Sequence, residues 1–415
     1  MRVLIIGSGG RCHAIAWKIR QSSHLEELYV APGNAGMKDF CTLVNIDVLD
    51  NEALCSFAIS HQIDLTIVGP EAALMNGVVD YFEARGLKIF GPNKRAAIIE
   101  GSKEYAKDLM KKYDIPTAKY EVFDNYDLAM EYLDKVGVPI VIKYDGLAAG
   151  KGVVVAHEMN EACEALKDML LLHKYGDSKV VIEEYLEGPE FSLMAFVHHD
   201  KVYPLDIAQD HKRAYDGDLG PNTGGMGAYS PVPFISKEVV FDAVSNIMEK
   251  TALALVKEGR PFVGILYGGL MLTKEGPKVI EFNARFGDPE TEVVLPRLKN
   301  DLLEVIQNVI MGVDVSLSFE DNCCLGVVLA SKGYPNSYQK NYPIFGDLDK
   351  AFHMGTKFSD GSFYTNGGRV LFVIGKGKTM KEAQADAYQN VSKISCENLF
   401  YRHDIGYQVI RSEDK

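Results

Sequence analysis

Short apolar runs alternate with stretches of helical spacing over roughly the first quarter of the chain. Each run ends in a cluster of glycine, proline or asparagine, and the runs are Val3–Ile6, Leu28–Val30, Asp64–Val68 and Leu87–Phe90. The stretch Cys12–Gln21, after the first run, has the pattern of a helix. Apolar strands separated by helices predict a parallel, doubly wound sheet. Ligands of such sheets bind at the carboxyl ends of the strands, where these clusters fall.

The rest of the chain falls into blocks of mixed strand and helix patterns. Ser102 can cap a helix over Lys103–Tyr113, because a serine hydroxyl accepts an N–H of the first turn. A block from Glu190 to about Leu317 is rich in β-branched strands and glycine turns. The other expected elements are strands at Pro139–Lys143, Val153–Ala156, Val180–Glu184, Leu325–Ala330 and Arg369–Ile374, and helices near Glu161–Leu172 and Met380–Ile394. The pattern predicts a multidomain fold of α/β and α+β type.

Length and composition narrow the class of protein. The chain has 415 residues, 47% hydrophobic and 24% charged, which is typical of a soluble globular protein of several domains. Its 44 basic and 57 acidic residues give a net charge of −13, which argues against a nucleic-acid partner but permits small phosphorylated ligands. Seven cysteines without a CxxC pair predict reduced thiols. With no signal-peptide pattern and no apolar stretch long enough for a membrane helix, we expect a cytoplasmic protein without a membrane partner.

The segment Gly7–Arg11, GSGGR, follows the first predicted strand and opens a helix. Backbone N–H groups at a helix N-terminus bind anions, so with Arg11 we expect a monophosphate site. A nicotinamide fingerprint fits poorly, because Cys12 stands at the third glycine position and the second strand ends without an acidic residue. A tight turn with only packing significance is the alternative.

The segment Asp145–Val153, DGLAAGKGV, lies between two predicted strands. It lacks the spacing of a Walker loop and the helix that follows one. A glycine-rich hairpin over a triphosphate, with Lys143 at the end of the preceding strand, is a different way to hold ATP. A plain hairpin turn is the alternative, and it would be shorter.

Two acidic or charged segments follow. Glu183–Leu186, with Glu190 beyond it, can present backbone groups to adenine and a carboxylate to ribose, although alone it fits a solvated acidic strand end better. The loop Gln209–Tyr229 is dense in polar residues and glycine, and such long loops are tolerated where a ligand orders them. His211 fits a structural or a catalytic role equally, but its charged neighbours Asp210, Lys212 and Arg213 favour a substrate loop.

The segment Glu281–Glu290, EFNARFGDPE, carries the most specific chemistry. Alternation along a strand over Val279–Arg285 would place Glu281, Asn283 and Arg285 on one face. Oxygen ligands from Glu281 and Asn283 suit Mg²⁺, which takes one or two protein ligands plus nucleotide phosphates. Arg285 can bind a carboxylate or an acyl phosphate. The segment predicts an ATP-dependent ligase that joins a carboxylate to an amine, whereas an ordinary amphipathic strand would not explain the RFGDPE that follows.

With these motifs the chain resembles the phosphoribosylamine–glycine ligase (glycinamide ribonucleotide synthetase) family of the ATP-grasp superfamily. The resemblance covers essentially the whole length and is carried by GSGGRCHA, APGNAG, TIVGPE, IFGP, EGSKEYAK, PIVIKYDGLAAGKGV, QDHKRAYDGDLGPNTGGMGAYSP, EFNARFGDPETE and TNGGRVL. It implies a doubly wound pre-ATP-grasp domain, an ATP-grasp core with a mobile lid, and a small C-terminal α+β domain. The expected boundaries are 1–101, 102–118 with 188–318 for the core, 119–187 for the lid, and 319–415.

The resemblance also implies the reaction. The carboxylate of glycine attacks the γ-phosphate of ATP to give glycyl phosphate and ADP, and the amine of 5-phosphoribosylamine then displaces phosphate to form glycinamide ribonucleotide in de novo purine (IMP) biosynthesis. Such chemistry needs aligned substrates, neutralised charge and a dry site rather than a protein nucleophile. ATP is a co-substrate, Mg²⁺ or Mn²⁺ the cofactor, and the chain is expected to be a monomer or weak homodimer.

Residue roles follow from the same resemblance. ATP is expected to contact Lys103 and Lys143 through its phosphates, the hairpin residues Gly150, Lys151 and Gly152, then Glu183, Glu184, Tyr185 and Leu186 around adenine, and Glu190 at ribose. The metal ligands are Glu281 and Asn283. Glycine or the acyl phosphate meets Asp210, Lys212, Arg285, Gly287 and Asp288, of which Asp210, Lys212 and Arg285 are the catalytic candidates. Phosphoribosylamine meets Gly9, Gly10, Arg11, Asn34 and Glu71.

Three positions depart from the family's usual pattern, and two other functions compete. Cys12 replaces a glutamate, Tyr144 a small residue, and Glu292 a glutamine or methionine; none is an inferred metal ligand or phosphate lysine. An ATP-grasp carboxylating ligase is disfavoured by the loop at 209–229. A regulatory protein without turnover is disfavoured because the candidate metal ligands and phosphate-binding cations are all present.

Overall fold

The N-terminal part of the chain folds into a parallel sheet, as predicted. The computed structural model describes residues 1–146 and 152–413. The strand order is β3-β2-β1-β4-β5, and all of these pairings are parallel. The strands are β1 (Arg2–Gly7), β2 (Glu27–Pro32), β3 (Thr42–Leu43), β4 (Leu65–Val68) and β5 (Ile89–Phe90). The helical segments between and after them are α1 (Gly10–Ile19), η1 (Ala35–Met37), α2 (Asn51–Ser60), α3 (Glu71–Met75), α4 (Val78–Glu83) and α5 (Lys94–Gly101).

The strand order reverses at β1, which pairs with β2 on one side and β4 on the other. The loops that follow β1 and β4 therefore lie at the switch point of the sheet, the usual place of a ligand crevice. Helix α1 begins directly after β1, at Gly10, and α3 begins directly after β4, at Glu71. The predicted Gly7–Arg11 cluster and Glu71 thus lie together at the carboxyl ends of β1 and β4 in the parallel sheet.

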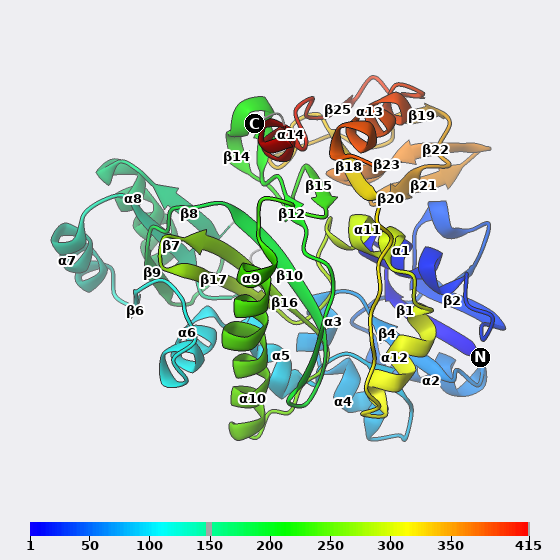
Figure 1. The fold of residues 1–415 in the computed structure, drawn as a ribbon, viewed down its shortest axis with the longest axis horizontal. Helices are drawn as coiled ribbons and strands as arrows, with labels where there is room; N and C mark the ends of the chain where they lie inside the picture. Colours follow the sequence, from blue (N-terminus) through cyan, green and yellow to red (C-terminus); the bar gives the residue numbers. More distant parts are fainter. Residues whose placement is uncertain (147–151, 414–415) are drawn as a thin grey trace.

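A second, antiparallel sheet forms the centre of the molecule (Figure 1). Its order is β11-β10-β16-β17. The strands are β10 (Glu190–His198), β11 (Lys201–Pro204), β16 (Val263–Thr273) and β17 (Gly276–Asn283). Helix α6 (Lys103–Lys112) leads into this part, and the Ser102 hydroxyl accepts the N–H of Tyr105 at 3.1 Å, which confirms the predicted cap.

The same block contains helices that its strand-like pattern did not predict. One helical stretch comprises α9 (Lys237–Ala243), a π-helical turn η4 (Val244–Glu249) and α10 (Lys250–Lys257). Shorter pieces follow as α11 (Thr291–Val294), η5 (Leu295–Arg297) and α12 (Leu302–Ile310). Several of these segments are rich in valine, whose propensity favours strands, so tertiary packing overrides the local preference here.

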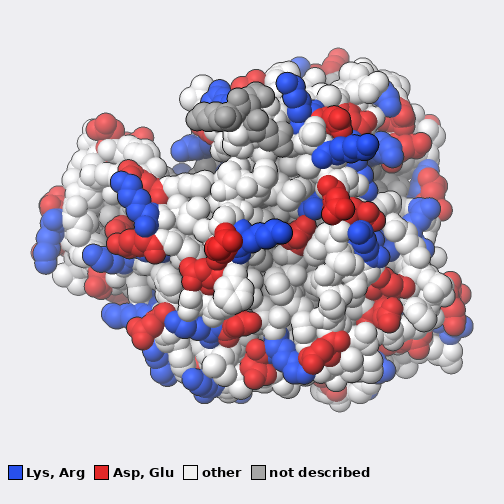
Figure 2. Space-filling view, in the orientation of Figure 1, with Lys and Arg blue, Asp and Glu red and all other residues white. Residues whose placement is uncertain are grey.

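A peripheral unit forms a separate lobe, at the left in Figures 1 and 2. Its sheet order is β6-β9-β7-β8, and it has a hydrophobic cluster of its own. The elements are β6 (Tyr120–Phe123), α7 (Tyr126–Val136), β7 (Ile140–Tyr144), β8 (Val153–Ala156), α8 (Met159–Leu166), a π-helical turn η2 (Lys167–Leu171) and β9 (Val180–Glu184). The three strands predicted in this block are confirmed, and the predicted helix is present with a π-helical end.

The C-terminal part adds a mixed unit at the upper right of Figure 1. Its main sheet follows the order β12-β15-β18-β23-β20, with β25 beside β18. These strands are β12 (Gln209–Asp210), β15 (Gly227–Ser230), β18 (Cys323–Ser331), β20 (Ala351–His353), β23 (Arg369–Gly377) and β25 (Leu399–Phe400). Around them lie β19 (Pro343–Gly346), β21 (Thr356–Ser359), β22 (Ser362–Thr365), β24 (Ile394–Ser395), α13 (Met380–Val391) and α14 (Tyr407–Glu413). The loop predicted to bind substrate therefore begins and ends in strands of this sheet; it contains β13 (Arg213–Tyr215), η3 (Asp216–Asp218) and β14 (Leu219–Asn222).

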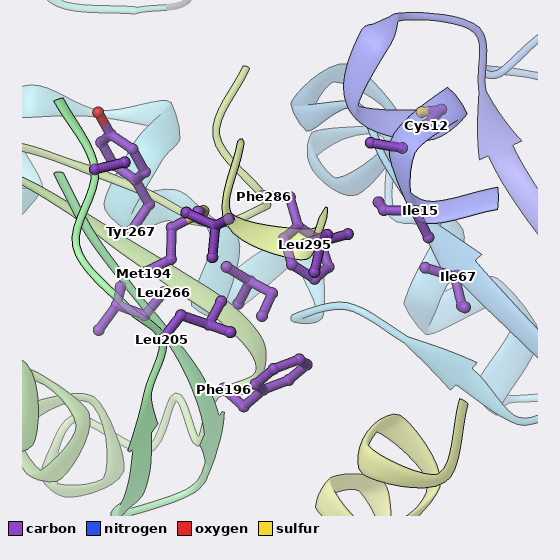
Figure 3. Close-up of a cluster of buried hydrophobic side chains, with 14 of the residues drawn as sticks. Cys12, Ile15, Ile67, Met194, Phe196, Leu205, Leu266, Tyr267, Phe286 and Leu295 are labelled. Atoms are coloured by element: carbon purple, nitrogen blue, oxygen red, sulfur yellow. The ribbon is translucent and has the colours of Figure 1, made fainter. Parts of the chain in front are cut away.

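One hydrophobic cluster runs through the N-terminal, central and C-terminal sheets. Figure 3 shows Phe286 and Leu295 between Ile67 of the N-terminal sheet and Phe196 of the central sheet. The segment after β17 is thus fixed by buried apolar contacts on both sides. Within the described residues, no helix is both long and apolar enough to cross a membrane.

Candidate active site

The EFNARFGDPE segment lies where β17 ends at the edge of the central sheet. Glu281 and Asn283 are two residues apart in this strand, so their side chains share a face, as predicted. The prediction that the strand continues to Arg285 is wrong, because β17 ends at Asn283. The chain leaves the ladder there, and the N–H of Ala284 donates to the buried carboxylate of Glu100 at 2.7 Å.

Glu281 lies in a field of positive charge. Burial acts to raise the pKa of its carboxyl group, but neighbouring cations outweigh burial and the net shift is downward. These cations are Lys143, Lys212, Lys103 and Arg285. Glu281 is therefore a carboxylate at neutral pH, surrounded by side chains that can also bind phosphate oxygens.

Lys143 joins the peripheral unit to the central sheet. Its Nζ lies 3.0 Å from the Glu183 carboxylate and donates to the backbone oxygen of Ile280 at 2.9 Å. Lys107 of α6 lies 2.9 Å from the same carboxylate. Burial, opposed by Glu183, lowers the pKa of Lys107 to about 8. Glu183 was predicted to lie near adenine. The residue is only 3% exposed, and its carboxylate lies between these two lysines.

Lys103 lies at the start of α6 and reaches the glycine-rich hairpin. Its backbone N–H donates to Asp145 Oδ1 at 2.5 Å, and its Nζ donates to the Gly146 oxygen at 3.0 Å. Burial lowers the pKa of its ammonium group, with Glu281 opposing the shift. The hairpin closes through Gly152, whose oxygen accepts the Tyr144 N–H at 2.8 Å. The predicted contacts at Gly150 and Lys151 lie outside the described residues.

The segment between β9 and β10 joins the peripheral unit to the central sheet. Glu184 is exposed, and Tyr185 and Leu186 are half-buried. The Tyr185 ring packs edge-on against His157 of the peripheral unit, with centroids 5.3 Å apart. Glu190 begins β10 and accepts from Lys212 at 2.8 Å.

Asp210 and Lys212 form a charged pair facing Glu190. Lys212 Nζ lies 3.1 Å from Asp210 Oδ1. Burial raises the pKa of Asp210 to about 6, although Lys212 acts against this shift. Burial opposes the charge of Lys212, but Asp210 and Glu190 raise its pKa well above the usual value. The loop thus contributes a carboxylate and an ammonium group next to the cations around Glu281.

Arg285 connects the strand end to the N-terminal sheet. Its Nε lies 3.4 Å from Glu71, its Nη2 lies 3.0 Å from Glu100, and Nη2 donates to Asn283 Oδ1 at 2.9 Å. Burial would lower its pKa, but Glu100 and Glu71 raise it, so the guanidinium stays charged. Glu71 is in turn held as a carboxylate, because Arg11 and Arg285 outweigh the effect of burial on its pKa.

Asp288 lies at the junction of three parts of the chain. Its Oδ1 lies 2.9 Å from Arg369 of β23, and its Oδ2 lies 3.6 Å from Arg11 Nε and accepts the Arg11 backbone N–H at 3.3 Å. These two arginines lower the pKa of Asp288 against the effect of burial. The sequence predicts that backbone N–H groups at the start of α1 bind a phosphate. Of these groups, the N–H of Arg11 donates to Asp288 instead.

The other residues predicted to bind phosphoribosylamine or the acyl phosphate lie around the same junction. Gly9 is the N-cap of α1, and a Cβ on Gly10 would overlap Glu292. Asn34 is buried, and its Nδ2 donates to the backbone oxygens of Ser8 and His353 at 2.7 and 2.8 Å. Gly287 is buried, and its N–H points to the sulfur of Met194 at 3.2 Å.

The three departures from the family pattern are all buried side chains. Cys12 packs beneath Gly7 and Gly69, and burial raises the pKa of its thiol to about 12, so it is a neutral core residue. Tyr144 packs in the core of the peripheral unit, its ring 5.7 Å from that of Tyr175. Glu292 is fully buried and, among the described residues, neither of its oxygens has a hydrogen-bond partner.

Burial and the nearby Asp288 raise the pKa of Glu292 well above its usual value, with Arg369 opposing. A neutral Glu292 matches the uncharged residues usual at this position. Glu292→Gln should therefore weaken the dependence of stability on pH. At pH values above the ordinary pKa of a glutamate, Glu292 keeps its proton in the folded chain and loses it in the unfolded chain. The contribution of Glu292 to wild-type stability therefore falls as pH rises, by up to about 1.4 kcal/mol per pH unit.

Glutamine takes up no proton, so the variant should lose this slope and be more stable than wild type at neutral pH. The measurement is urea unfolding at a series of pH values. Glu304→Gln, which changes an exposed glutamate of α12, should leave the slope unchanged. Equal slopes for wild type and Glu292→Gln would contradict the neutral carboxyl.

Several residues of the site were not singled out from the sequence. Lys107 forms an ion pair with Glu183, Glu100 with Arg285, and Arg369 with Asp288. All three lie inside quoted motifs, Glu100 and Lys107 in EGSKEYAK and Arg369 in TNGGRVL. Their positions inside these motifs could have indicated a role at the site. The residues that they contact are far away in sequence, so the contacts themselves could not be predicted.

The residues present suit a divalent cation. Glu281 is ionised and shares a strand face with Asn283, whose Oδ1 is held in place by Arg285. One carboxylate and one amide oxygen leave most coordination positions to water and phosphate, as Mg²⁺ prefers. In the described residues no group of three or more His, Cys, Asp or Glu side chains could hold a metal ion.

Comparison with protein families matches three consecutive parts of the chain. Residues 1–100 match the model described as "Phosphoribosylglycinamide synthetase, N domain", residues 101–291 the "ATP-grasp (A) domain", and residues 324–408 the "C domain". Among solved structures, a biotin carboxylase complex from Campylobacter jejuni is similar in fold, with a TM-score of 0.74, 14% identity and coverage of 96% of this chain and 92% of that chain. The match to the ATP-grasp domain model, together with the fold, defines an ATP-grasp enzyme.

Relatives specify the family. The phosphoribosylamine–glycine ligase of Halalkalibacterium halodurans is 57% identical over 99% of this chain and 97% of its own length. That of Listeria innocua is 54% identical over 98% of this chain and 99% of its own. The crystal structure of the Thermotoga maritima ligase has a TM-score of 0.86, 36% identity and coverage of 98% and 100%. The chain belongs to the phosphoribosylamine–glycine ligase family, which confirms the resemblance and the expected multidomain architecture.

Proposed function

We propose that this chain joins glycine to 5-phosphoribosylamine, converting ATP to ADP and phosphate and forming glycinamide ribonucleotide. One observation carries the proposal. A cationic site around Glu281 is connected through Arg285 to Glu71 at the switch point of the N-terminal sheet. The proposed phosphoryl-transfer site and the proposed binding site of the second substrate would therefore be adjacent. The family's reaction in de novo purine biosynthesis supports the same assignment.

In the first step, a carboxylate oxygen of glycine attacks the γ-phosphorus of ATP, and the bond to ADP breaks. Lys103 and Lys143 would bind the phosphates, and Glu190 the ribose. Arg285 would orient the glycine carboxylate, while Asp210 would pair with its ammonium group. The product is glycyl phosphate, held by Arg285 and Lys212.

In the second step, the amine of phosphoribosylamine attacks the acyl carbon, phosphate leaves, and the amine loses a proton. Gly9, Gly10, Arg11, Asn34 and Glu71 are the candidate residues for holding the amine substrate. Asp288 would act through Arg11 by fixing its position. Glu281 and Asn283 would hold a magnesium or manganese ion, which neutralises charge on the phosphates when bound.

The adenine would lie against the segment Glu184–Leu186, between the peripheral unit and the central sheet. We assign the peripheral unit, residues 119–187, as the lid and residues 102–118 with 188–318 as the core, between an N-terminal domain of 1–101 and a C-terminal domain of 319–415. The separate hydrophobic cluster of the peripheral unit supports its movement as one body. Closure of such a lid would protect glycyl phosphate from water.

Phosphate release from ATP tests the substrate assignment. The purified chain is assayed with glycine or with bicarbonate, each with and without freshly generated phosphoribosylamine. The proposal predicts release that requires glycine and rises at least tenfold when the amine is added, because the amine discharges the acyl phosphate. Release with bicarbonate alone would indicate a carboxylating ligase, and no release with any pair would indicate a protein without turnover.

A further inference from the structure

The loop that carries Lys212 is held from behind by the end of the chain. We define the site loop as His211–Met226 and the C-terminal clamp as Arg402–Tyr407. Figure 1 shows α14, which begins in the clamp, beside β14 of the site loop, although nearly two hundred residues separate them in sequence. Hydrogen bonds and ion pairs join the two segments, some of them buried and others exposed.

Alternation along the chain separates two sides of this loop. Asp210 and Lys212 point to the candidate site, where they contact each other and Glu190. His211 lies between them and points the other way, where it is 2% exposed. The His211 Nε2 accepts the backbone N–H of Gly406 at 3.0 Å, which leaves its Nδ1 as the donor. The Asp218 carboxylate lies 4.0 Å from Nδ1.

Arg402 is the centre of the clamp. It is fully buried, and its Nε and Nη2 donate to the two oxygens of Asp404 at 2.8 and 2.9 Å. Its Nη1 lies 2.8 Å from Asp218 and donates to the backbone oxygen of Arg213 at 3.1 Å. One guanidinium therefore ties the start and the middle of the site loop to the clamp.

Further hydrogen bonds join the site loop to the clamp. Asp404 accepts the backbone N–H of Gly217 at 2.8 Å, and Tyr407 donates to Asp218. The clamp itself is anchored to α13, because Tyr388 donates to the Arg402 oxygen at 2.7 Å and accepts the N–H of Ile405 at 3.1 Å. The loop is thus bonded to a rigid helix through the clamp.

We propose that Arg402 is a positioning residue, and that the clamp Arg402–Tyr407 holds the site loop so that Lys212 faces the bound acyl phosphate. The assignment of that ligand rests on the proposed function, whereas the mechanical coupling does not. The sequence of this loop predicts that a ligand orders it. The clamp holds the loop from the side opposite to the candidate site.

Arg402→Met tests the coupling, since methionine keeps an unbranched apolar stem and removes every donor. Amide hydrogen exchange at Gly217, Thr223 and Met226 should accelerate by about tenfold or more, the factor associated with losing a charged hydrogen bond. Trypsin cleavage after Lys212 and Arg213 should accelerate similarly. Amides of β16 in the central sheet should keep their protection, which shows that the chain remains folded.

Activity should change in a specific way. The kcat of glycine-dependent phosphate release should fall about tenfold, because Lys212 no longer faces the acyl phosphate, whereas the KM for ATP, whose proposed contacts lie mostly elsewhere, should change little. His403→Ala is the matched control, because His403 contacts Asp216 of the same loop but is exposed and keeps its backbone hydrogen bond. Arg402→Lys should be intermediate between wild type and Arg402→Met.

Unchanged loop exchange in a folded Arg402→Met would overturn the inference. If β16 also loses protection, Asp404→Asn decides the matter by the same criteria, since it weakens only one side of the network. Exchange and trypsin cleavage require no substrate. A wild-type chain without glycine-dependent phosphate release would therefore refute the proposed function and leave this test of the coupling intact.

Discussion

Glu281→Ala is expected to reduce glycine-dependent phosphate release from ATP by roughly 10³-fold, the effect of losing several kcal/mol of transition-state stabilisation. Glu281 is the one ionised carboxylate of the proposed metal pair, and Asn283 alone is a weak ligand. Its removal also leaves the surrounding lysines without their central counter-charge. The rate should recover only in part at high magnesium concentration, because the remaining ligand cannot position the ion.

The matched control is Glu275→Ala. Glu275 lies just before the same strand, and its exposed carboxylate pairs with Lys278 at 2.6 Å. This variant should keep near wild-type activity. Near wild-type activity in Glu281→Ala, with magnesium dependence unchanged, would show that the metal assignment is wrong.

Glu183→Ala is expected to destabilise the contact between the peripheral unit and α6 by about 3–5 kcal/mol, the usual effect of removing one partner of a buried ion pair. Lys143 and Lys107 both contact this carboxylate within 3.0 Å and are almost fully buried. Without it, two ammonium groups face each other in a site that excludes water. Amide hydrogen exchange in β7 and β9 gives the local free energy of opening.

Glu184→Ala provides the comparison within the same strand. Glu184 is exposed and its side chain accepts one long hydrogen bond, from the Lys119 N–H at 3.3 Å. Its removal should change the free energy of opening by less than about 0.5 kcal/mol, as for most surface substitutions. Similar exchange in the two variants would contradict the structural role of Glu183.

Much of the fold follows from local sequence patterns. Strands β1, β2, β4 and β5 of the N-terminal sheet were predictable because each is a short apolar run that ends in glycine or proline. The edge strand β3 was not predicted, because it has only two residues and both are exposed. The cap at Ser102 was predictable because its hydroxyl and the helix lie within a few residues. The helices at Lys237–Lys257 were not, because valine-rich stretches satisfy strand propensity and only packing against the central sheet reveals them.

The candidate site was predictable where the chemistry is contained in one segment. Glu281 and Asn283 share a strand, so spacing alone places their side chains together. Partners from distant segments could not be found in this way. Glu100 is far from Arg285 in sequence, and Arg402 is almost equally far from Asp218, yet each pair lies within 3.0 Å. Their contacts follow from the packing of whole units.

The origin of the released phosphate oxygen tests the central claim most directly. Glycine labelled with ¹⁸O in its carboxylate is incubated with ATP, phosphoribosylamine and the enzyme, and the inorganic phosphate is analysed by mass. Formation of glycyl phosphate transfers one carboxylate oxygen to the phosphate when the amine displaces it. The account predicts one ¹⁸O in each phosphate released; unlabelled phosphate accompanied by glycinamide ribonucleotide would contradict it.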